Sequence, residues 1–374
     1  MHLYAPGSWK VGRSTMTRQF VRVAPLLLGI LLSWNGGDPL TRPVVPRPVS
    51  VEFQRDTLLL EIGVIAGDRN QVFGNIRDVD VDGDGNILIL DDQDFSLSWF
   101  GPNGRFRGRT GRHGGGPSEF QAPAGLAVSP AGQVYVLDAA ARKTAEFALG
   151  EEGLEFVRSF PVPVYGSDMC LSDGRLVVLG QVSDGTPQVY ILSEEGEVIR
   201  SFEPGFPRQL PPRGLERFAA FFASSHGRGH VHCAGGDVLA IASERLGIVR
   251  WFSTQGDFIR EVTINGFSPV TWTPNSGGGL SMGVDPATGV AHTLSHLSGG
   301  GPGQIVATIH RASMEDMTGG LDIYVLDSGS GEQSSPIPSE AVASAFAHHR
   351  LYSFVRDPFP KVLIQTIPQW LRRQ

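Results

Sequence analysis

Short apolar runs alternate with glycine-containing turns through most of the chain. The clearest group of runs lies at residues 76–81, 87–90, 97–100 and 106–109. Alternation of apolar and polar positions with a period of two is typical of half-buried strands, and glycine supplies the positive φ that hairpin turns require. The pattern therefore predicts a unit of four short antiparallel strands.

Further copies of this unit follow along the chain and become less regular. Residues 125–160, 168–202 and 230–264 each hold four predicted strands separated by turns that contain glycine. Repeats of roughly 40–50 residues have the size of one β-propeller blade. The first four units therefore predict four successive blades.

The fifth and sixth units depart from the pattern. In the fifth, strands are expected at 279–284, 290–294 and 321–326, with a Gly-rich insertion at 298–319. The sixth, at 341–367, holds only three predicted strands, and an unpartnered β-rich run lies at 51–65. That run can complete the sixth unit. Because radially repeated sheets protect their edges, we predict an all-β fold, a six-bladed β-propeller of four-stranded antiparallel blades whose ring is closed by the N-terminal strand.

The segment that links the first two units resembles a known family. Residues 110–120 read Thr-Gly-Arg-His-Gly-Gly-Gly-Pro-Ser-Glu-Phe, and Pro123 and an apolar run follow. This segment is similar to the linker between blades of six-bladed propellers of the NHL-repeat type, with Ser118 in place of the usual third Gly of that motif. The preceding Leu60-Glu-Ile-Gly63 and Gly67-Asp68 resemble the N-terminus of secreted bacterial six-bladed propellers. The resemblance covers residues 58–160. It implies a fold and no single activity, because propellers support many functions.

The N-terminal residues indicate export. Arg18 and Arg22 precede an apolar run at 23–32 that is too short to cross a bilayer as a helix. A positive segment before such a run is typical of a secretory signal, with an uncleaved anchor or a start at Met16 as alternatives. We expect a signal peptide or N-terminal hydrophobic segment at 1–35, a Pro-rich linker at 36–50, a propeller at 51–374, and a secreted or periplasmic/cell-envelope location.

Composition and charge narrow the function classes. The 374 residues carry 31 Lys and Arg against 38 Asp and Glu, a formal charge of −7, and the basic residues form no block. We therefore expect no nucleic-acid partner. The sequence holds no nucleophile elbow, P-loop or dinucleotide fingerprint, so we predict no catalytic residues and no cofactor.

Two cysteines occupy near-equivalent positions in adjacent units. Cys170 and Cys233 each lie a few residues before the turn that follows a predicted innermost strand. Adjacent blades bring such strands together at the hub, and export permits a disulfide. The alternative is a pair of buried free thiols that pack as small hydrophobes.

Two motifs raise the question of a metal. His230 and His232 share one face of a predicted innermost strand, where imidazoles could bind zinc or simply make ordinary hydrogen bonds. The acidic turn from Asp80 to Asp91 has the spacing of a calcium loop, although its last position is Asp and no helices flank it. We favour a hairpin turn there, and we keep calcium or zinc as an alternative to a metal-free protein.

The longest early insertion, at 203–229, holds a predicted short helix at 215–225. Phe218, Phe221 and Phe222 share one side of it, and Arg208, Arg213 and Arg217 accompany it. The segment can be a lid over the channel mouth that offers arginines to an anionic group. Alternatively, it is a loop that packs its phenylalanines on the propeller and leaves its arginines in water.

These features leave three hypotheses for function. The first is a secreted module that binds a ligand or protein at the channel mouth or loop face, without evident catalytic machinery. The second is a metal-assisted lyase or hydrolase of propeller type with its site in the central channel. The third is a structural module in an envelope assembly. We expect an unknown small molecule or envelope protein as the partner, a monomer, and no stable transmembrane span once processed.

Overall fold

The computed structural model describes residues 57–374, apart from 152, 209, 315–318, 369–370 and 372–374. The predicted signal segment at 1–35 and the linker at 36–50 lie outside the described residues. Within this part of the chain, no helix is long and apolar enough to span a membrane.

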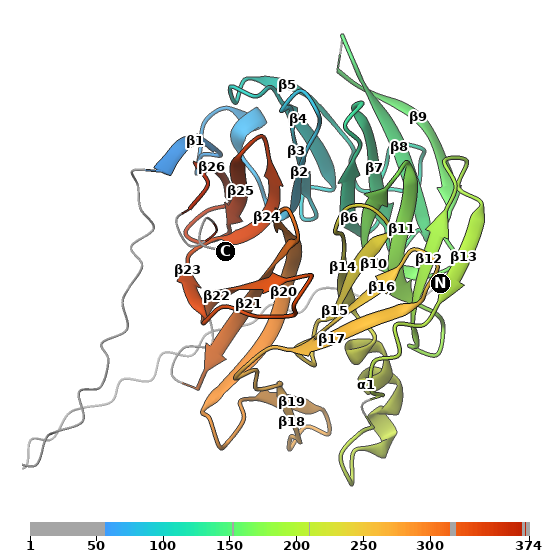
Figure 1. The fold of residues 1–374 in the computed structure, drawn as a ribbon, viewed down its shortest axis with the longest axis vertical. Helices are drawn as coiled ribbons and strands as arrows, with labels where there is room; N and C mark the ends of the chain where they lie inside the picture. The colour runs from blue at the N-terminus through green and yellow to red at the C-terminus, as the bar shows by residue number, and fades with distance from the viewer. Residues whose placement is uncertain (1–56, 152, 209, 315–318, 369–370, 372–374) are drawn as a thin grey trace, which may run out of the picture. The chain divides into compact units, whose positions relative to one another are not determined.

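The described strands form six four-stranded antiparallel sheets and one separate two-stranded hairpin. The first four blades follow chain order from the innermost to the outermost strand (Figure 1). Blade one holds β2 (Ile76–Val81), β3 (Ile87–Asp91), β4 (Ser96–Phe100) and β5 (Phe106–Thr110). Blade two holds β6 (Pro123–Val128), β7 (Gln133–Asp138), β8 (Lys143–Gly150) and β9 (Gly153–Pro161).

Blades three and four repeat the same arrangement. Blade three holds β10 (Tyr165–Ser172), β11 (Arg175–Gln181), β12 (Pro187–Leu192) and β13 (Val198–Phe202). Blade four holds β14 (Gly229–Cys233), β15 (Val238–Ser243), β16 (Ile248–Ser253) and β17 (Phe258–Thr263). Blade five begins with β20 (Val290–Gly301), and blade six with β24 (Val342–Ala347). The innermost strands contact one another in the order β2, β6, β10, β14, β20 and β24, and β24 returns to β2, so the ring is closed.

The N-terminal strand completes the last blade, as predicted. Blade six holds β24, β25 (Arg350–Val355) and β26 (Lys361–Thr366), and β1 (Leu58–Ile62) adds the fourth strand by antiparallel pairing with β26. Leu60 faces Ile364 in this register. The two ends of the propeller thus hold each other in one sheet.

The prediction for the fifth blade was wrong in detail. The region predicted as its first strand instead forms a hairpin of β18 (Thr271–Pro274) and β19 (Leu280–Gly283). The supposed insertion at 298–319 belongs largely to β20 and β21 (Gln304–Ser313), and β22 (Gly320–Asp327) and β23 (Ile337–Ser339) complete the sheet. The C-terminal part of β20 was not predicted because consecutive glycines there are typical of a loop. At Gly299 a Cβ would lie 3.0 Å from His232 Nε2, so this position takes glycine because a neighbouring blade approaches closely.

The core lies between the blades. Within β3, Ile87 and Ile89 pack into the cluster shared with blade six, whereas Leu88 and Leu90 pack into the cluster shared with blade two. Alternate side chains of a strand point to opposite faces, so one central strand fills two interfaces. Each fully buried aliphatic side chain contributes about 1.5–3 kcal/mol to folding. This is why the strand pattern is clearest in the middle of each blade.

Candidate functional site

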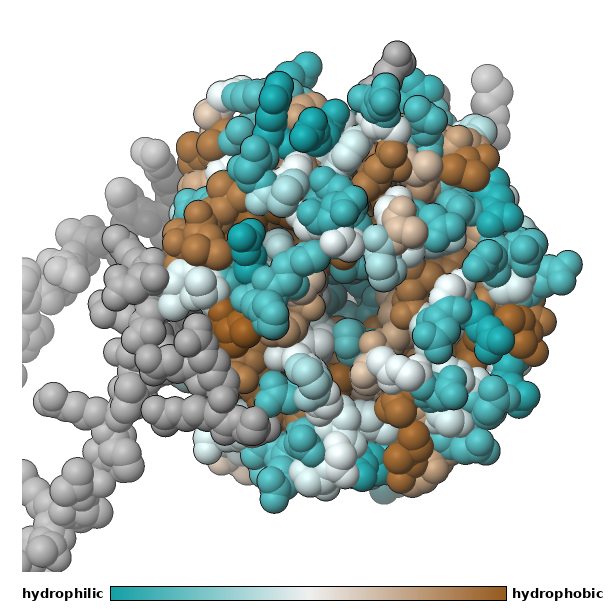
Figure 2. Space-filling view, turned by 45° about the horizontal axis from the view of Figure 1, so that its top comes forward, coloured by the Kyte–Doolittle hydropathy of each residue, from teal (hydrophilic) through white to brown (hydrophobic). Residues whose placement is uncertain are grey.

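A cavity of about 470 Å³ lies on the propeller axis and is lined by residues from all six innermost strands. Figure 2 shows the molecule hollowed near its centre. On β2 the lining runs from Asp78 to Val81, on β10 from Asp168 to Leu171, and past β14 it includes Gly235. The cavity therefore extends from the middle of these strands to their C-terminal ends, where it opens.

Arg77 closes the axis below the cavity. Its Nε donates to the Ala124 carbonyl at 3.0 Å and its Nη2 to the Ser167 carbonyl at 3.3 Å. Irregularities in the registers of β2, β6 and β10 occur at Arg77, Ala124 and Ser167. Such bulges leave a residue outside the ladder, which frees its backbone for other partners. One guanidinium thus links three blades.

Asp78 joins blades six, one and two at the cavity floor. Its Oδ1 accepts from Val79 N and from Ser344 Oγ, both at 2.8 Å, and its Oδ2 accepts from Leu126 N at 3.3 Å. The Asp78 side chain is buried. Neighbouring blades are separate sheets in the described chain and share no ladder of main-chain hydrogen bonds. The Asp78 carboxylate links them through side-chain hydrogen bonds instead.

Asp168 plays the same part between blades three and four. Its Oδ1 accepts from Met169 N at 2.8 Å. Its Oδ2 accepts from Val231 N at 3.1 Å and lies 3.2 Å from His230 Nδ1. Asp168 and His230 are both buried. The pair therefore forms a fixed polar contact between two adjacent blades.

His296 differs from these neighbours because it is buried without a hydrogen bond. Its residue exposure is 8%, and it lines the cavity. Its Nε2 lies 3.7 Å from Asp78 Oδ1, and its ring centre lies 5.7 Å from that of His230. No hydrogen bond to its ring occurs within the described chain. The imidazole thus presents unused bonding capacity to the cavity.

The pKa values at the floor favour neutral forms. Burial raises the pKa of Asp78 and of Asp168, which His296 partly opposes in both cases. Burial lowers the pKa of His296, and that of His230 falls to about 3. Burial raises the pKa of Asp80, on the cavity wall, to about 7, helped by the charges of Asp78 and Asp82. At neutral pH the histidines are therefore uncharged, and Asp80 titrates.

The two histidines considered for zinc have separate surroundings. His230 lies against Asp168, whereas His232 lines the cavity, where its ring approaches Gly299 of blade five. Burial lowers the pKa of His232 to about 4. Over the described ranges, no group of three or more His, Cys, Asp or Glu side chains is placed to hold a metal ion.

The acidic turn of blade one is a hairpin turn. Asp82 Oδ1 accepts from Asp84 N at 2.9 Å and from Asn86 N at 2.8 Å. Asp91 lies at the far end of β3, about 15 Å away for a five-residue strand. Its carboxylate accepts from Gly74 N at 2.7 Å and Asn75 N at 3.1 Å. The two ends of the calcium-like spacing cannot reach one ion.

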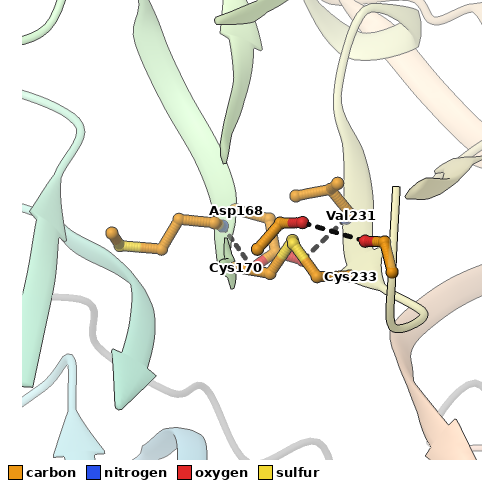
Figure 3. Close-up of a disulfide and its surroundings, with 7 residues drawn as sticks. Asp168, Cys170, Val231 and Cys233 are labelled. Carbon is orange, nitrogen blue, oxygen red and sulfur yellow. Dashed lines mark hydrogen bonds between the residues drawn. A yellow bond between two sulfur atoms is a disulfide. The ribbon is translucent and has the colours of Figure 1, made fainter. Parts of the chain in front are cut away.

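Cys170 and Cys233 form a disulfide in this structure. The S–S distance is 2.12 Å and the Cα atoms lie 5.7 Å apart. Figure 3 shows the bond crossing from β10 to β14, beside the hydrogen bond from Val231 to Asp168. Both cysteines line the cavity. The disulfide therefore fixes the spacing of two innermost strands in the cavity wall.

The insertion before β14 lies at the other end of the axis. Its helix α1 (Ala219–His226) ends shortly before β14 begins, and the innermost strands begin opposite the cavity opening. The rings of Phe221 and Trp272 of β18 meet edge to face at 5.0 Å, and Figure 1 shows α1 and the β18–β19 hairpin at the same end.

None of the three arginines proposed for a lid lines the cavity. Arg208 Nη2 donates to Thr186 Oγ1 at 2.8 Å, and Arg217 Nη2 donates to the Gly278 carbonyl at 3.0 Å. Arg213 is exposed. These contacts tie the insertion to neighbouring loops.

Sequence reasoning did not bring Asp78, Asp168 and His296 together as a site. A usable signal was present, since Asp78 and Asp168 are carboxylates in the interior of innermost strands, each followed directly by an apolar residue. Buried charged residues of this kind are rare unless they are paired.

Comparisons with known proteins support the fold. A family model described as DUF5128, 6-bladed beta-propeller, matches residues 68–199. No curated protein matches the chain. Hydrazine synthase of Kuenenia stuttgartiensis is similar in structure at 13% identity and a TM-score of 0.51, with 83% of both chains covered. A putative exported protein of Bacteroides fragilis has 12% identity and a TM-score of 0.51, with 83% of this chain and 95% of that chain covered. At such identities the likeness concerns the fold alone.

Proposed function

We propose that this protein is an exported binding protein that takes a ligand into its axial cavity. The observation that carries the proposal is His296, which is buried on the cavity floor and has no hydrogen bond to any described residue. The ring lines the cavity, so a ligand that enters can bond to this imidazole without displacing a protein partner.

The size and walls of the cavity support a small organic ligand or a single protruding side chain. Its volume of about 470 Å³ lies within the range of about 300–1,000 Å³ typical of ligand pockets. Apolar residues such as Val81, Val128 and Phe346 alternate there with a few polar groups. The closed ring and the disulfide hold these groups in place before binding, which reduces the entropy lost on association.

Two features support export. The N-terminal sequence has a short apolar run after positive residues, and Cys170 and Cys233 form a disulfide. Disulfides persist in oxidising compartments and are rare in the cytosol. Mass spectrometry of the mature protein from culture medium or periplasm tests this part, and an uncleaved cytosolic protein would contradict it.

The binding proposal is tested with a thermal-shift panel of small cations, neutral molecules and anions. Ligands that bind only the folded state raise the melting temperature. Ala347→Trp fills the cavity wall, whereas Ala220→Trp places the same side chain on the exposed surface of α1. We expect ligands to bind the wild type and Ala220→Trp but not Ala347→Trp. Ligands that bind Ala347→Trp with unchanged affinity would contradict the cavity as the site.

Acid–base catalysis is a second candidate, because two Asp–His contacts with displaced pKa values lie at the floor. Such groups often mark catalytic sites. In the metal-assisted form, a lyase or hydrolase would retain stoichiometric zinc or calcium in elemental analysis, and His230→Ala/His232→Ala would lose it. In the metal-free form, a bound ligand would be consumed by the wild type and not by His296→Ala. A ligand recovered intact after long incubation leaves binding as the function.

A further inference from the structure

We propose that the ligand of this cavity is an organic cation, an ammonium or guanidinium group on an apolar body, whose charged head binds between Asp80 and the floor formed by Asp78, Asp168 and His296. This inference rests on the proposed function of the cavity and names the class of ligand.

The charge of the lining carries the first step. All charged side chains that line the cavity in the described chain are aspartates, namely Asp78, Asp80 and Asp168. The nearby guanidinium of Arg77 is bonded to the Ala124 and Ser167 carbonyls below the floor. Three carboxyl groups thus share a partly desolvated space that has no lysine or arginine in its described wall, and a ligand cation would favour their ionised forms.

Asp80 has acceptor capacity left for such a cation. Its Oδ1 accepts from Val81 N and its Oδ2 from Val128 N, both at 2.8 Å. An ionised carboxylate has about four lone-pair sites, so each oxygen can accept a further bond. Asp80 is half-buried in the cavity wall, where a charge-assisted bond is about twice as strong as a neutral one. The Asp80 carboxylate therefore fits an N–H⁺ donor.

His296 adds an acceptor at the floor. Because burial lowers its pKa, the ring is neutral and offers one nitrogen lone pair and one N–H. Its Nε2 is 3.7 Å from Asp78 Oδ1, which is too far for a hydrogen bond but close enough for one donor-rich head to contact both residues. An anionic head would be repelled by ionised Asp80 and would find no lysine or arginine in the described lining.

The upper wall indicates an organic cation rather than a metal ion. Above the floor, the lining includes Val81, Val128, Leu171, Phe346 and the Cys170–Cys233 disulfide. These groups offer no ligands to a hard cation, which prefers several oxygens. They do cover an alkyl or aromatic body. The cavity thus matches an amphipathic molecule that enters with its charged end first.

The turns around the opening extend the same sign of charge. Asp84, Asp173 and Asp237 are exposed on the turns that follow β2, β10 and β14, and Arg175 and Arg350 lie among them. The whole chain carries a formal charge of −7. A net negative rim raises the encounter rate of a cation.

Two sources share this chemistry, a free amine and a Lys or Arg side chain on a partner protein. The first arm of the test therefore compares 2-phenylethylammonium with neutral 2-phenylethanol and anionic phenylacetate by calorimetry. The second arm compares an N-acetylated, C-amidated pentapeptide Gly-Ser-Lys-Ser-Gly with the same peptide in which norleucine replaces lysine. In the arm that binds, we expect the cationic probe to bind at least tenfold more tightly than the other probes of that arm. The arm that binds identifies the source.

Affinity for the cation is also measured from pH 5.5 to 8. A pKa near 7 at Asp80 predicts an increase of about 30-fold, which levels off above pH 7. Several other titratable or charged side chains face the surroundings of Asp80. They are Arg77, Asp78 and Asp82 from β2 and its turn, Asp168 from β10, His230 and His232 from β14, and His296 from β20. His348 also lies nearby, with its Nε2 3.0 Å from the Asp82 carbonyl oxygen. The lining residues of β6 and β24 do not titrate.

Asp80→Asn should lose at least tenfold in affinity for the cation and most of its pH dependence. Asp84→Asn, on the exposed turn, is the matched control and should stay within twofold of the wild type. Because Asp80 accepts two main-chain bonds, the variant can fail to fold, and in that case the charge series and the pH profile of the wild type decide.

Equal or tighter binding of the neutral or anionic probe, or an affinity that falls as pH rises, would overturn the cation while leaving the cavity as a binding site. Absence of binding by every member of both arms at millimolar concentration would also overturn it. The proposed function fails separately, if panel ligands bind Ala347→Trp as well as they bind the wild type.

Discussion

The two ends of the propeller axis use buried charge in different ways. At the closed end, the Arg77 guanidinium donates to the carbonyls of two neighbouring blades, and Asp168 accepts from Val231 and contacts His230. In the cavity above, Asp80 keeps free lone pairs on the wall, and His296 faces the cavity from the floor without a hydrogen bond within the described residues. Buried charge alone therefore does not identify a site. Bonding capacity left unused beside a cavity does.

The largest expected effect concerns the disulfide in the wall of the open end. Cys170→Ser/Cys233→Ser should lower the free energy of unfolding by about 4 kcal/mol, because the bond closes a loop with a sequence separation of 63. Guanidinium denaturation of the variant and of the oxidised wild type measures the difference. Reduced wild type should match the variant, and a loss below about 1 kcal/mol would show that the ring alone holds β10 and β14 together.

The next effect tests the partnered charges of the floor. Asp168→Ala removes the acceptor for Val231 N and the neighbour of His230, so we expect a loss of about 3 kcal/mol. Asp84→Ala, on the exposed turn of blade one, should change stability by less than about 0.5 kcal/mol. Urea denaturation of both variants provides the comparison. An equal loss of unfolding free energy in both variants would show that the hydrogen bonds of Asp168 add no stability beyond that of an exposed aspartate.

The ionisation of Asp80 should lower stability as pH rises from about 4 to 7. Its pKa is raised from 3.8 to about 7 in the folded protein, so the folded state binds the proton more tightly and stability is lost as pH rises between these values. Asp80→Asn lacks this loss. Its stability relative to the wild type should therefore improve by about 2 kcal/mol from pH 5 to pH 8. A difference that stays constant with pH would contradict the raised pKa.

The smallest expected effect concerns the helix at the closed end. Phe221 is 39% exposed and meets Trp272 edge to face at 5.0 Å, so Phe221→Ala should cost about 1 kcal/mol. Affinity for cavity ligands should stay within twofold, because α1 lies away from the opening. A tenfold change in affinity would restore a role for the insertion as a lid.

Most of the blades could be predicted from the sequence, because their central strands are buried on both faces and form short apolar runs between glycine-containing turns. The fifth blade could not, since Gly299 and its neighbouring glycines imitate a loop where close contact with His232 requires a small residue. The positions of Cys170 and Cys233 could be anticipated, because their blades are regular and adjacent.

The site itself was less accessible to sequence reasoning. In a propeller the axis faces the edge of each innermost strand. The alternation of side chains along a strand therefore indicates which neighbouring blade a side chain packs on. It does not indicate which residues face the axis. Bulges beside Asp78, Asp168 and His296 add to this difficulty, because they turn residues out of the regular pattern. His296 also lies in β20, the strand that the predicted insertion divided.

A crystal structure of the wild type with 2-phenylethylammonium tests the account most directly, because it distinguishes the two ends of the axis. We predict the ligand nitrogen within hydrogen-bond distance of Asp80, with the phenyl ring against Phe346 and the disulfide. A ligand found instead between α1 and the β18–β19 hairpin would contradict the axial cavity as the binding site.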